Sequence, residues 1–174
     1  MQHRPTGLLP YSPIALLPDL QNSFHKIVFN ARIGINNREV RKMKAVEYFM
    51  EQGYSCAESV MQGAIDEGVV PKELLPVASS FSGGMGSGCL CGAIGASQCI
   101  IGYLFGKNNS EGNDYLARIK AKEFISEFKK NHKATCCRVL TAGMDMASPE
   151  RKAHCANMVD ECSKIVKEII KVKV

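Results

Sequence analysis

The sequence predicts an all-α protein: a single-domain helical bundle of about five to six helices around a buried central helix, preceded by a poorly structured N-terminal tail. Apolar residues recur at three- and four-residue steps over much of the chain, which is typical of helices. No segment alternates polar and apolar residues over more than a few positions. The 174 residues, 45% of them hydrophobic, are enough for one core and too few for two ordinary domains.

The first 42 residues differ in composition from the rest. All eight cysteines follow Met43, while four of the seven prolines fall in the first 18 residues: Pro5, Pro10, Pro13 and Pro18. Proline breaks helices and removes a backbone donor. Six Lys or Arg residues against two acidic ones place most of the net charge of +5 in this segment. We therefore expect residues 1–42 to be an N-terminal extension, either disordered or upstream of the true start, and residues 43–174 to be the folded domain.

Local signals mark the first two helices. Residues 44–52 are predicted as a short helix that stops near Gly53. Ser55 and Glu58 then fit a capping box, in which the serine accepts from a first-turn N–H and the glutamate reaches back to the serine N–H. A second helix is therefore expected from this point to about residue 67.

A third helix and a glycine loop follow. Pro71 suits the first turn of a helix that runs to about residue 81. Residues 82–88 (SGGMGSG) form a glycine loop. The loop is a poor match to a phosphate-binding loop, because it follows a helix-like segment and lacks the Gly-Lys-Ser/Thr ending.

The uncharged residues 89–105 are predicted as the buried central helix. Their length approaches that of a membrane span, but Gln98 and three glycines lower the hydrophobicity, and flanking anchors are missing. We therefore expect no membrane insertion. Amphipathic patterns over residues 114–130 and 148–171 predict two longer helices that complete the bundle.

The cysteine content indicates where and how the protein works. The N-terminus lacks the pattern of a secretory signal, so a reducing, cytoplasmic environment is expected. In that environment clustered cysteines indicate metal ligands or redox thiols rather than structural disulfides. From Met43 onward the charges nearly balance, and a nucleic-acid surface is not expected.

Four cysteines are the main candidates for a site. Cys56 and Cys91 fall at predicted helix starts, where free N–H groups and the helix dipole favour a thiolate. Cys137 is followed by Arg138, which could favour a thiolate or pair with an anionic centre. Cys155 begins an apolar stripe on the last helix.

The remaining cysteines are secondary. Cys89 and Cys136 are the next candidates, whereas Cys99 and Cys162 are expected in the core. No CxxC motif occurs, so neither a zinc knuckle nor a thioredoxin-type site is indicated. If a centre exists, its ligands come singly from four parts of the chain.

These cysteines and their neighbours resemble the C_GCAxxG_C_C family of small bacterial and archaeal proteins. The resemblance covers about residues 43–170, and four stretches carry it: residues 53–60 (GYSCAESV), 81–86 with 91–93 (FSGGMG and CGA), 137–140 (CRVL) and 155–159 (CANMV). The closing glycine of the signature falls on Ala96, with a glycine one place earlier at Gly95. Cys89, Cys99, Cys136 and Cys162 are additional to the family pattern.

The resemblance implies a redox-active or metal-binding role. A similar cysteine domain accompanies haem in split-Soret cytochromes, where an iron–sulfur cluster is expected. Our leading hypothesis is an iron–sulfur cluster or another thiophilic metal held by Cys56, Cys91, Cys137 and Cys155, serving electron transfer or redox sensing.

Several alternatives stay open. They are metal-free thiol–disulfide chemistry, a structural zinc site, and cysteines that only pack in the core. We expect an unidentified redox partner, and the glycine-rich central helix could support a homo-oligomer. Electron transfer or metal binding is a better expectation than a substrate-specific enzyme.

Overall fold

The computed structural model describes residues 44–171, so the expected extension over residues 1–42 lies outside the described residues. The elements are α2 (Ala45–Glu51), α3 (Cys56–Asp66), the 3₁₀ turn η1 (Lys72–Leu74), α4 (Leu75–Ser79), the glycine turn η2 (Gly84–Gly88), α5 (Gly92–Phe105), α6 (Tyr115–Asn131), α7 (Cys137–Leu140) and α8 (Pro149–Lys171). Between residues 44 and 171 the extended pairing is a single bridge between Leu90 and Cys136. The all-α prediction is confirmed.

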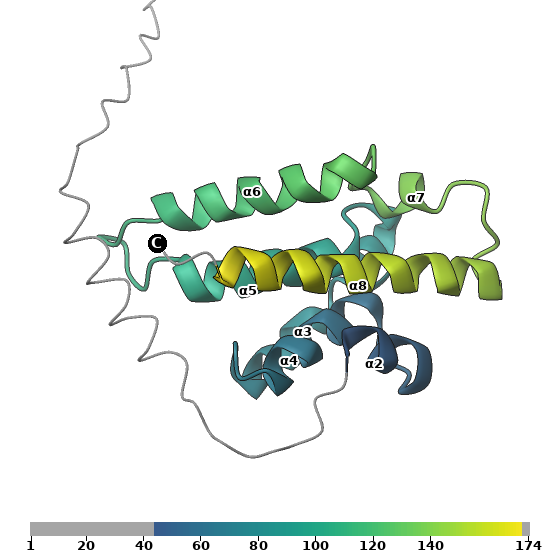
Figure 1. The fold of residues 1–174 in the computed structure, drawn as a ribbon, viewed down its shortest axis with the longest axis horizontal. Helices are drawn as coiled ribbons and strands as arrows, with labels where there is room; N and C mark the ends of the chain where they lie inside the picture. Colours follow the sequence, from purple (N-terminus) through teal and green to yellow (C-terminus); the bar gives the residue numbers. More distant parts are fainter. Residues whose placement is uncertain (1–43, 172–174) are drawn as a thin grey trace, which may run out of the picture.

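Helix α8 joins the two sides of the bundle. It runs alongside α6 on one side and contacts α2 and α3 on the other, with α5 packed against it (Figure 1). Most of α5 is buried, as predicted for a central helix. Seven α-helices are seen in the described part, where five to six were expected, because the one-turn helix α7 was not predicted.

The core forms where α3, α5, α6 and α8 meet. Its largest fully buried side chains come from these four helices: Met61, Ile94, Ile100, Ile101, Phe124, Phe128 and Val159. Burying one such side chain stabilises the fold by about 1.5–3 kcal/mol. This core holds the N-terminal ends of α3 and α5 in a fixed relation, and both ends carry a cysteine.

The capping box at the start of α3 is present as predicted. The Ser55 Oγ accepts from the Glu58 N–H at 3.3 Å, and the Ser55 N–H donates to the Glu58 carboxylate at 2.8 Å. The second oxygen of Glu58 accepts from the Ser79 hydroxyl at 2.5 Å, which fastens α4 to α3. These bonds from Ser79 and Ser55 lower the pKa of Glu58. The box fixes the residue that follows Ser55, which is Cys56.

Two predicted helices have different limits in the structure. The single helix expected over residues 71–81 is divided into η1 and α4, and Pro76, which has no N–H, lies in the first turn of α4. The central helix was expected from residue 89, but it begins at Gly92. The Cys91 N–H donates to the Thr135 carbonyl at 2.8 Å, and this pairing with a distant segment holds residues 89–91 extended.

None of the helices within residues 44–171 is long and apolar enough to cross a lipid bilayer.

Candidate functional site

The glycine loop before α5 winds through left-handed backbone. Gly83, Gly84, Gly86 and Gly88 all have φ between 60° and 72°, and Met85 has φ 56°. Met85 is the one side-chain-bearing residue with positive φ in the described part of the chain, so the loop imposes this conformation on it. The loop folds back at Cys89, where the Cys89 N–H donates to the Gly84 carbonyl at 3.0 Å. Its turn brings residues 89–91 against residues 135–137.

Cys56 and Cys91 meet where α3 and α5 begin. Cys56 is the first residue of α3, and Cys91 is the N-cap of α5. The contact depends on Gly92, because a Cβ at this position would lie 2.8 Å from the Cys56 Sγ and 2.6 Å from the Phe81 carbonyl oxygen. Only a residue without a side chain leaves space for the Cys56 thiol here.

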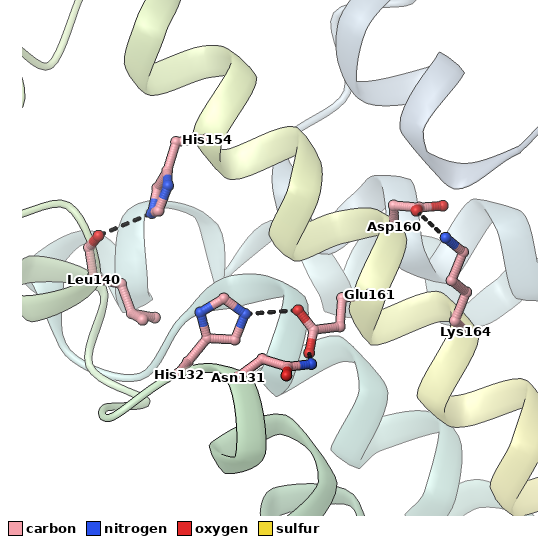
Figure 2. Close-up of polar contacts among 7 residues, drawn as sticks. All are labelled: Asn131, His132, Leu140, His154, Asp160, Glu161 and Lys164. Atoms are coloured by element: carbon pink, nitrogen blue, oxygen red, sulfur yellow. Dashed lines mark hydrogen bonds and ion pairs between the residues drawn. The ribbon is translucent and has the colours of Figure 1, made fainter.

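Cys137 is placed by the glycine loop and by α8. It is the first residue of α7, and its N–H donates to the Cys89 carbonyl. A Cβ on Gly84 would lie 2.8 Å from the Cys137 Cβ. The other end of α7 is held by His154, whose Nε2 donates to the Leu140 carbonyl at 2.9 Å (Figure 2). His154 directly precedes Cys155 on α8, so this bond ties the two cysteine-bearing helices together.

The thiols of Cys56, Cys91, Cys137 and Cys155 lie near enough for their charges to interact. Burial raises the pKa of Cys56, and Cys137 raises it further. Burial also raises the pKa of Cys91 to about 12, with smaller contributions from Cys56 and Cys137. The pKa of Cys155 is raised by burial first, then by Cys56 and Cys137, against a lowering by Arg151. Electrostatic interactions thus connect the four predicted cysteines, which lie at the starts of α3, α5 and α7 and within α8.

The sequence-based expectation that helix starts favour thiolates at Cys56 and Cys91 is wrong for the chain without a ligand. Backbone N–H groups of Gly83, Ala57 and Ala93 do lower the pKa of Cys56, as expected for a helix start. Burial outweighs them, because a desolvated thiolate costs more than these donors return. The thiols are accordingly protonated at neutral pH until something binds them.

The arrangement does not form a site for a single metal ion. Within residues 44–171, no three His, Cys, Asp or Glu side chains are grouped so that they could hold one ion. The four thiols are therefore close neighbours whose sulfur atoms do not surround one point.

The other cysteines differ in exposure. Cys162 is fully buried and Cys99 half-buried, which fits the predicted core roles. Cys162 nevertheless adjoins the group, because burial first and then Cys91 and Cys56 raise its pKa. Cys136 is half-buried and its Sγ donates to the Gly88 carbonyl at 3.0 Å. Cys89 is exposed. Of the adjacent cysteines 136 and 137, Cys137 is the one that interacts with Cys56, Cys91 and Cys155.

Two arginines have roles that the sequence did not indicate. Arg138 was expected to act on a thiolate or an anionic centre, but its Nη2 donates to the Ser87 carbonyl at 2.8 Å and fastens the glycine loop. Arg151 is the cation that lowers the pKa of Cys155. The sequence could have indicated this role of Arg151, because residues four apart on a helix are neighbours and Arg151 lies four residues before Cys155.

His132 joins the end of α6 to α8. Its Nε2 lies 2.6 Å from the Glu161 carboxylate, which also accepts from the Asn131 side chain at 2.9 Å (Figure 2). The imidazole ring stacks on Phe128. These contacts join the end of α6 to α8 and hold the segment that leads to Cys136.

One family of known proteins matches most of the chain. The family described as "Putative redox-active protein (C_GCAxxG_C_C)" matches residues 54–169. The chain belongs to the C_GCAxxG_C_C family. Its description names a redox-active protein, and the matched region contains all eight cysteines. The chain matches no curated protein and no solved structure.

Two glycines explain the tight packing at the start of α5. The first is Gly92, which lies between Cys91 and Ala93 and is the position that touches Cys56. The final glycine of the signature is replaced by Ala96, which is fully buried. The close approach is made at Gly95, where a Cβ would lie 3.2 Å from the Phe81 ring.

Proposed function

We propose that this C_GCAxxG_C_C protein is a redox protein whose Cys56, Cys91, Cys137 and Cys155 hold an iron–sulfur cluster, or another thiophilic metal centre, for electron transfer or redox sensing. The observation that carries the proposal is the convergence of four thiols from α3, α5, α7 and α8 at one end of the bundle. Four Cys thiolates are the usual ligand set of [2Fe–2S] and [4Fe–4S] clusters.

The donor atoms fit a cluster better than a single zinc ion. Two sulfurs bound tetrahedrally to one zinc, each at about 2.3 Å, stand only about 3.8 Å apart. Thiols that share one ion must therefore be packed tightly, and residues 44–171 contain no such group. In a [4Fe–4S] cluster each of the four thiolates binds a different iron atom and the sulfurs stand farther apart, which suits thiols that are neighbours without surrounding one point. When bound, the cluster supplies an electron-accepting and electron-donating couple.

The surrounding residues suit a redox centre. Burial of Cys56 and Cys91 would exclude water from one side of it. Backbone groups of Gly83 and Ala93 lower the pKa of Cys56, and N–H donors placed near cluster sulfurs tune the reduction potential. Arg151 places a positive charge beside Cys155. These groups would stabilise added negative charge when the centre accepts an electron.

Serine substitutions at the four cysteines test the proposal. Chain purified without oxygen, or reconstituted with iron and sulfide, should lose its bound iron in each of Cys56→Ser, Cys91→Ser, Cys137→Ser and Cys155→Ser. Cys99→Ser is the matched control, since Cys99 is half-buried on α5 and outside the group, and it should keep its iron.

The proposal would be refuted if Cys91→Ser kept the wild-type iron content while circular dichroism showed that the variant is folded. A metal-free dithiol protein would instead hold no iron in any variant and would form a defined disulfide on oxidation. A structural zinc site would give zinc, no redox couple, and unfolding by a chelator.

A further inference from the structure

Cys89 differs from the four cysteines of the proposed centre because its side chain is exposed. It lies where residues 89–91 cross residues 135–137 as a short antiparallel pair with one bridge at its middle. In this crossing the N–H of Cys137 donates to the carbonyl oxygen of Cys89. The backbone of the exposed Cys89 is therefore hydrogen-bonded to Cys137, a residue of the proposed centre.

The crossing places these two cysteines opposite each other. Leu90 pairs with Cys136 in an isolated bridge, and Cys89 and Cys137 flank that bridge across from each other, Cys89 at the end of the glycine turn and Cys137 as the first residue of α7. One backbone hydrogen bond joins the two residues, since the Cys89 N–H donates instead to the Gly84 carbonyl. In a fully hydrogen-bonded antiparallel pair the Cα atoms lie about 5.5 Å apart, and a disulfide needs a Cα separation of about 4.4–6.8 Å. The bond from Cys137 to Cys89 therefore keeps the two backbones near the separation that a disulfide needs.

Gly84 gives a second, independent indication that the two residues are near each other. A Cβ on Gly84 would lie 2.8 Å from the Cys137 Cβ and equally 2.8 Å from the Cys89 backbone nitrogen. Both cysteines thus border the same small space, which the missing side chain leaves free. Cys136 is engaged elsewhere, since its Sγ donates to the Gly88 carbonyl at 3.0 Å.

We propose that Cys89 and Cys137 form an intramolecular disulfide when the protein meets hydrogen peroxide, and that this bond withdraws Cys137 from the metal centre. The second half rests on the proposed function, whereas the disulfide itself does not. Cys89 acts as the peroxide-reactive entry point and Cys137 as the resolving thiol. The pair makes loading of the centre sensitive to oxidant.

The reaction balances with one peroxide for each pair of thiols. The Cys89 sulfur, as thiolate, attacks one peroxide oxygen; the O–O bond breaks, Cys89 becomes a sulfenic acid, and the released hydroxide takes up a proton to leave as water. The Cys137 sulfur then attacks the Cys89 sulfur, the S–O bond breaks, and a second water leaves with the proton of the Cys137 thiol. Two thiols and one hydrogen peroxide give one disulfide and two waters.

The test uses the full chain, reduced and freed of metal, then treated with hydrogen peroxide and blocked with an alkylating reagent. Trypsin leaves Cys89, Cys91 and Cys99 together in residues 73–107, and Cys136 with Cys137 in residues 134–138. Fragment ions of the linked peptides must therefore locate the bond within each one. We expect a link between Cys89 and Cys137 in the wild-type chain.

Variants assign the bond independently of the fragment spectra. Cys89→Ser and Cys137→Ser should abolish the link between the two peptides, whereas Cys136→Ser should retain it. A link that survives in Cys89→Ser, or no intramolecular link in the oxidised wild-type chain, would overturn the proposal. Since Cys89 is exposed, its serine variant is expected to fold, and circular dichroism checks this.

Binding of Cd²⁺, a thiophilic probe that can bridge neighbouring thiolates and needs no added reductant, tests whether Cys137 remains available to the centre. The oxidised wild-type chain should show weaker thiolate-to-cadmium absorption than the reduced chain and recover it after dithiothreitol, while peroxide-treated Cys89→Ser should keep it. If the link forms and cadmium uptake is unchanged, the switch is refuted although the disulfide stands. Failure of the proposed function looks different, because iron would then be retained in reduced Cys137→Ser.

Discussion

Alanine at Gly92 is expected to damage both the fold and the cysteine site. Gly92 is the first residue of α5, and its missing Cβ leaves space for α3. An added Cβ would meet the Phe81 carbonyl oxygen at 2.6 Å, the Cys56 Sγ at 2.8 Å and the Ala57 Cβ at 3.3 Å. The Phe81 oxygen belongs to the backbone and accepts from the Met85 N–H, so it cannot rotate away. The start of α5 must therefore move relative to α3.

The expected loss is about 2 kcal/mol of the free energy of unfolding. Overpacking a filled site costs about 1–3 kcal/mol. Alanine has a higher helix propensity than glycine, by about 1 kcal/mol in a helix interior, but this gain is small at the first residue of a helix and does not offset the overpacking. Displacement of Cys56 should also lower the iron bound by the chain under the conditions that load the wild type.

Gly102→Ala is the matched control on the same helix. Gly102 is exposed, and a Cβ at this position would meet nothing within 4 Å. This variant should be more stable than the wild type by about 0.5–1 kcal/mol. Urea unfolding followed by far-UV circular dichroism measures both variants. A Gly92→Ala variant as stable as the wild type would refute the packing described for α3 and α5.

Three further substitutions test the fold away from Gly92. Ser55→Ala removes the side-chain acceptor for the Glu58 N–H and should cost about 0.5–2 kcal/mol in urea unfolding; an unchanged midpoint would contradict the capping box. Tyr48 donates to Asp66 at 2.5 Å, and this bond first, then burial and the Asp66 charge, raise the pKa of Tyr48 from 10.0 to about 12, so the contribution is present below pH 10 and is lost as the pH rises toward 12. Tyr48→Phe should lack this part of the alkaline decline, and identical pH profiles would argue against the bond. Phe128→Ala empties a fully buried site and should cost about 3–5 kcal/mol in the same assay; a loss below about 1 kcal/mol would contradict its place in the core.

Local patterns were enough to predict the elements whose signals lie within a few residues. The capping box at Ser55 is an example, because both partners are three residues apart. The start of α5 could not be predicted in this way. It depends on the bond from Cys91 to Thr135, which lies far along the chain and has no periodic signal. Helix α7 has only four residues, too few for a helical pattern to appear.

In the candidate site, too, local features could be predicted and features that depend on the fold could not. Its cysteines could be selected from helix-start positions and from the family pattern. Their protonation state could not be predicted, because burial dominates the pKa of Cys56 and Cys91 and depends on the complete fold. The bond from His154 to Leu140 likewise joins two helices whose relative positions the sequence does not reveal.

Iron and acid-labile sulfide analysis of the full chain purified without oxygen, together with its visible spectrum, tests the central claim most directly. The account predicts iron and sulfide in near-stoichiometric amounts, with a visible absorption that dithionite bleaches. A colourless chain that holds no iron, even after incubation with iron and sulfide under reducing conditions, would contradict the proposed cluster.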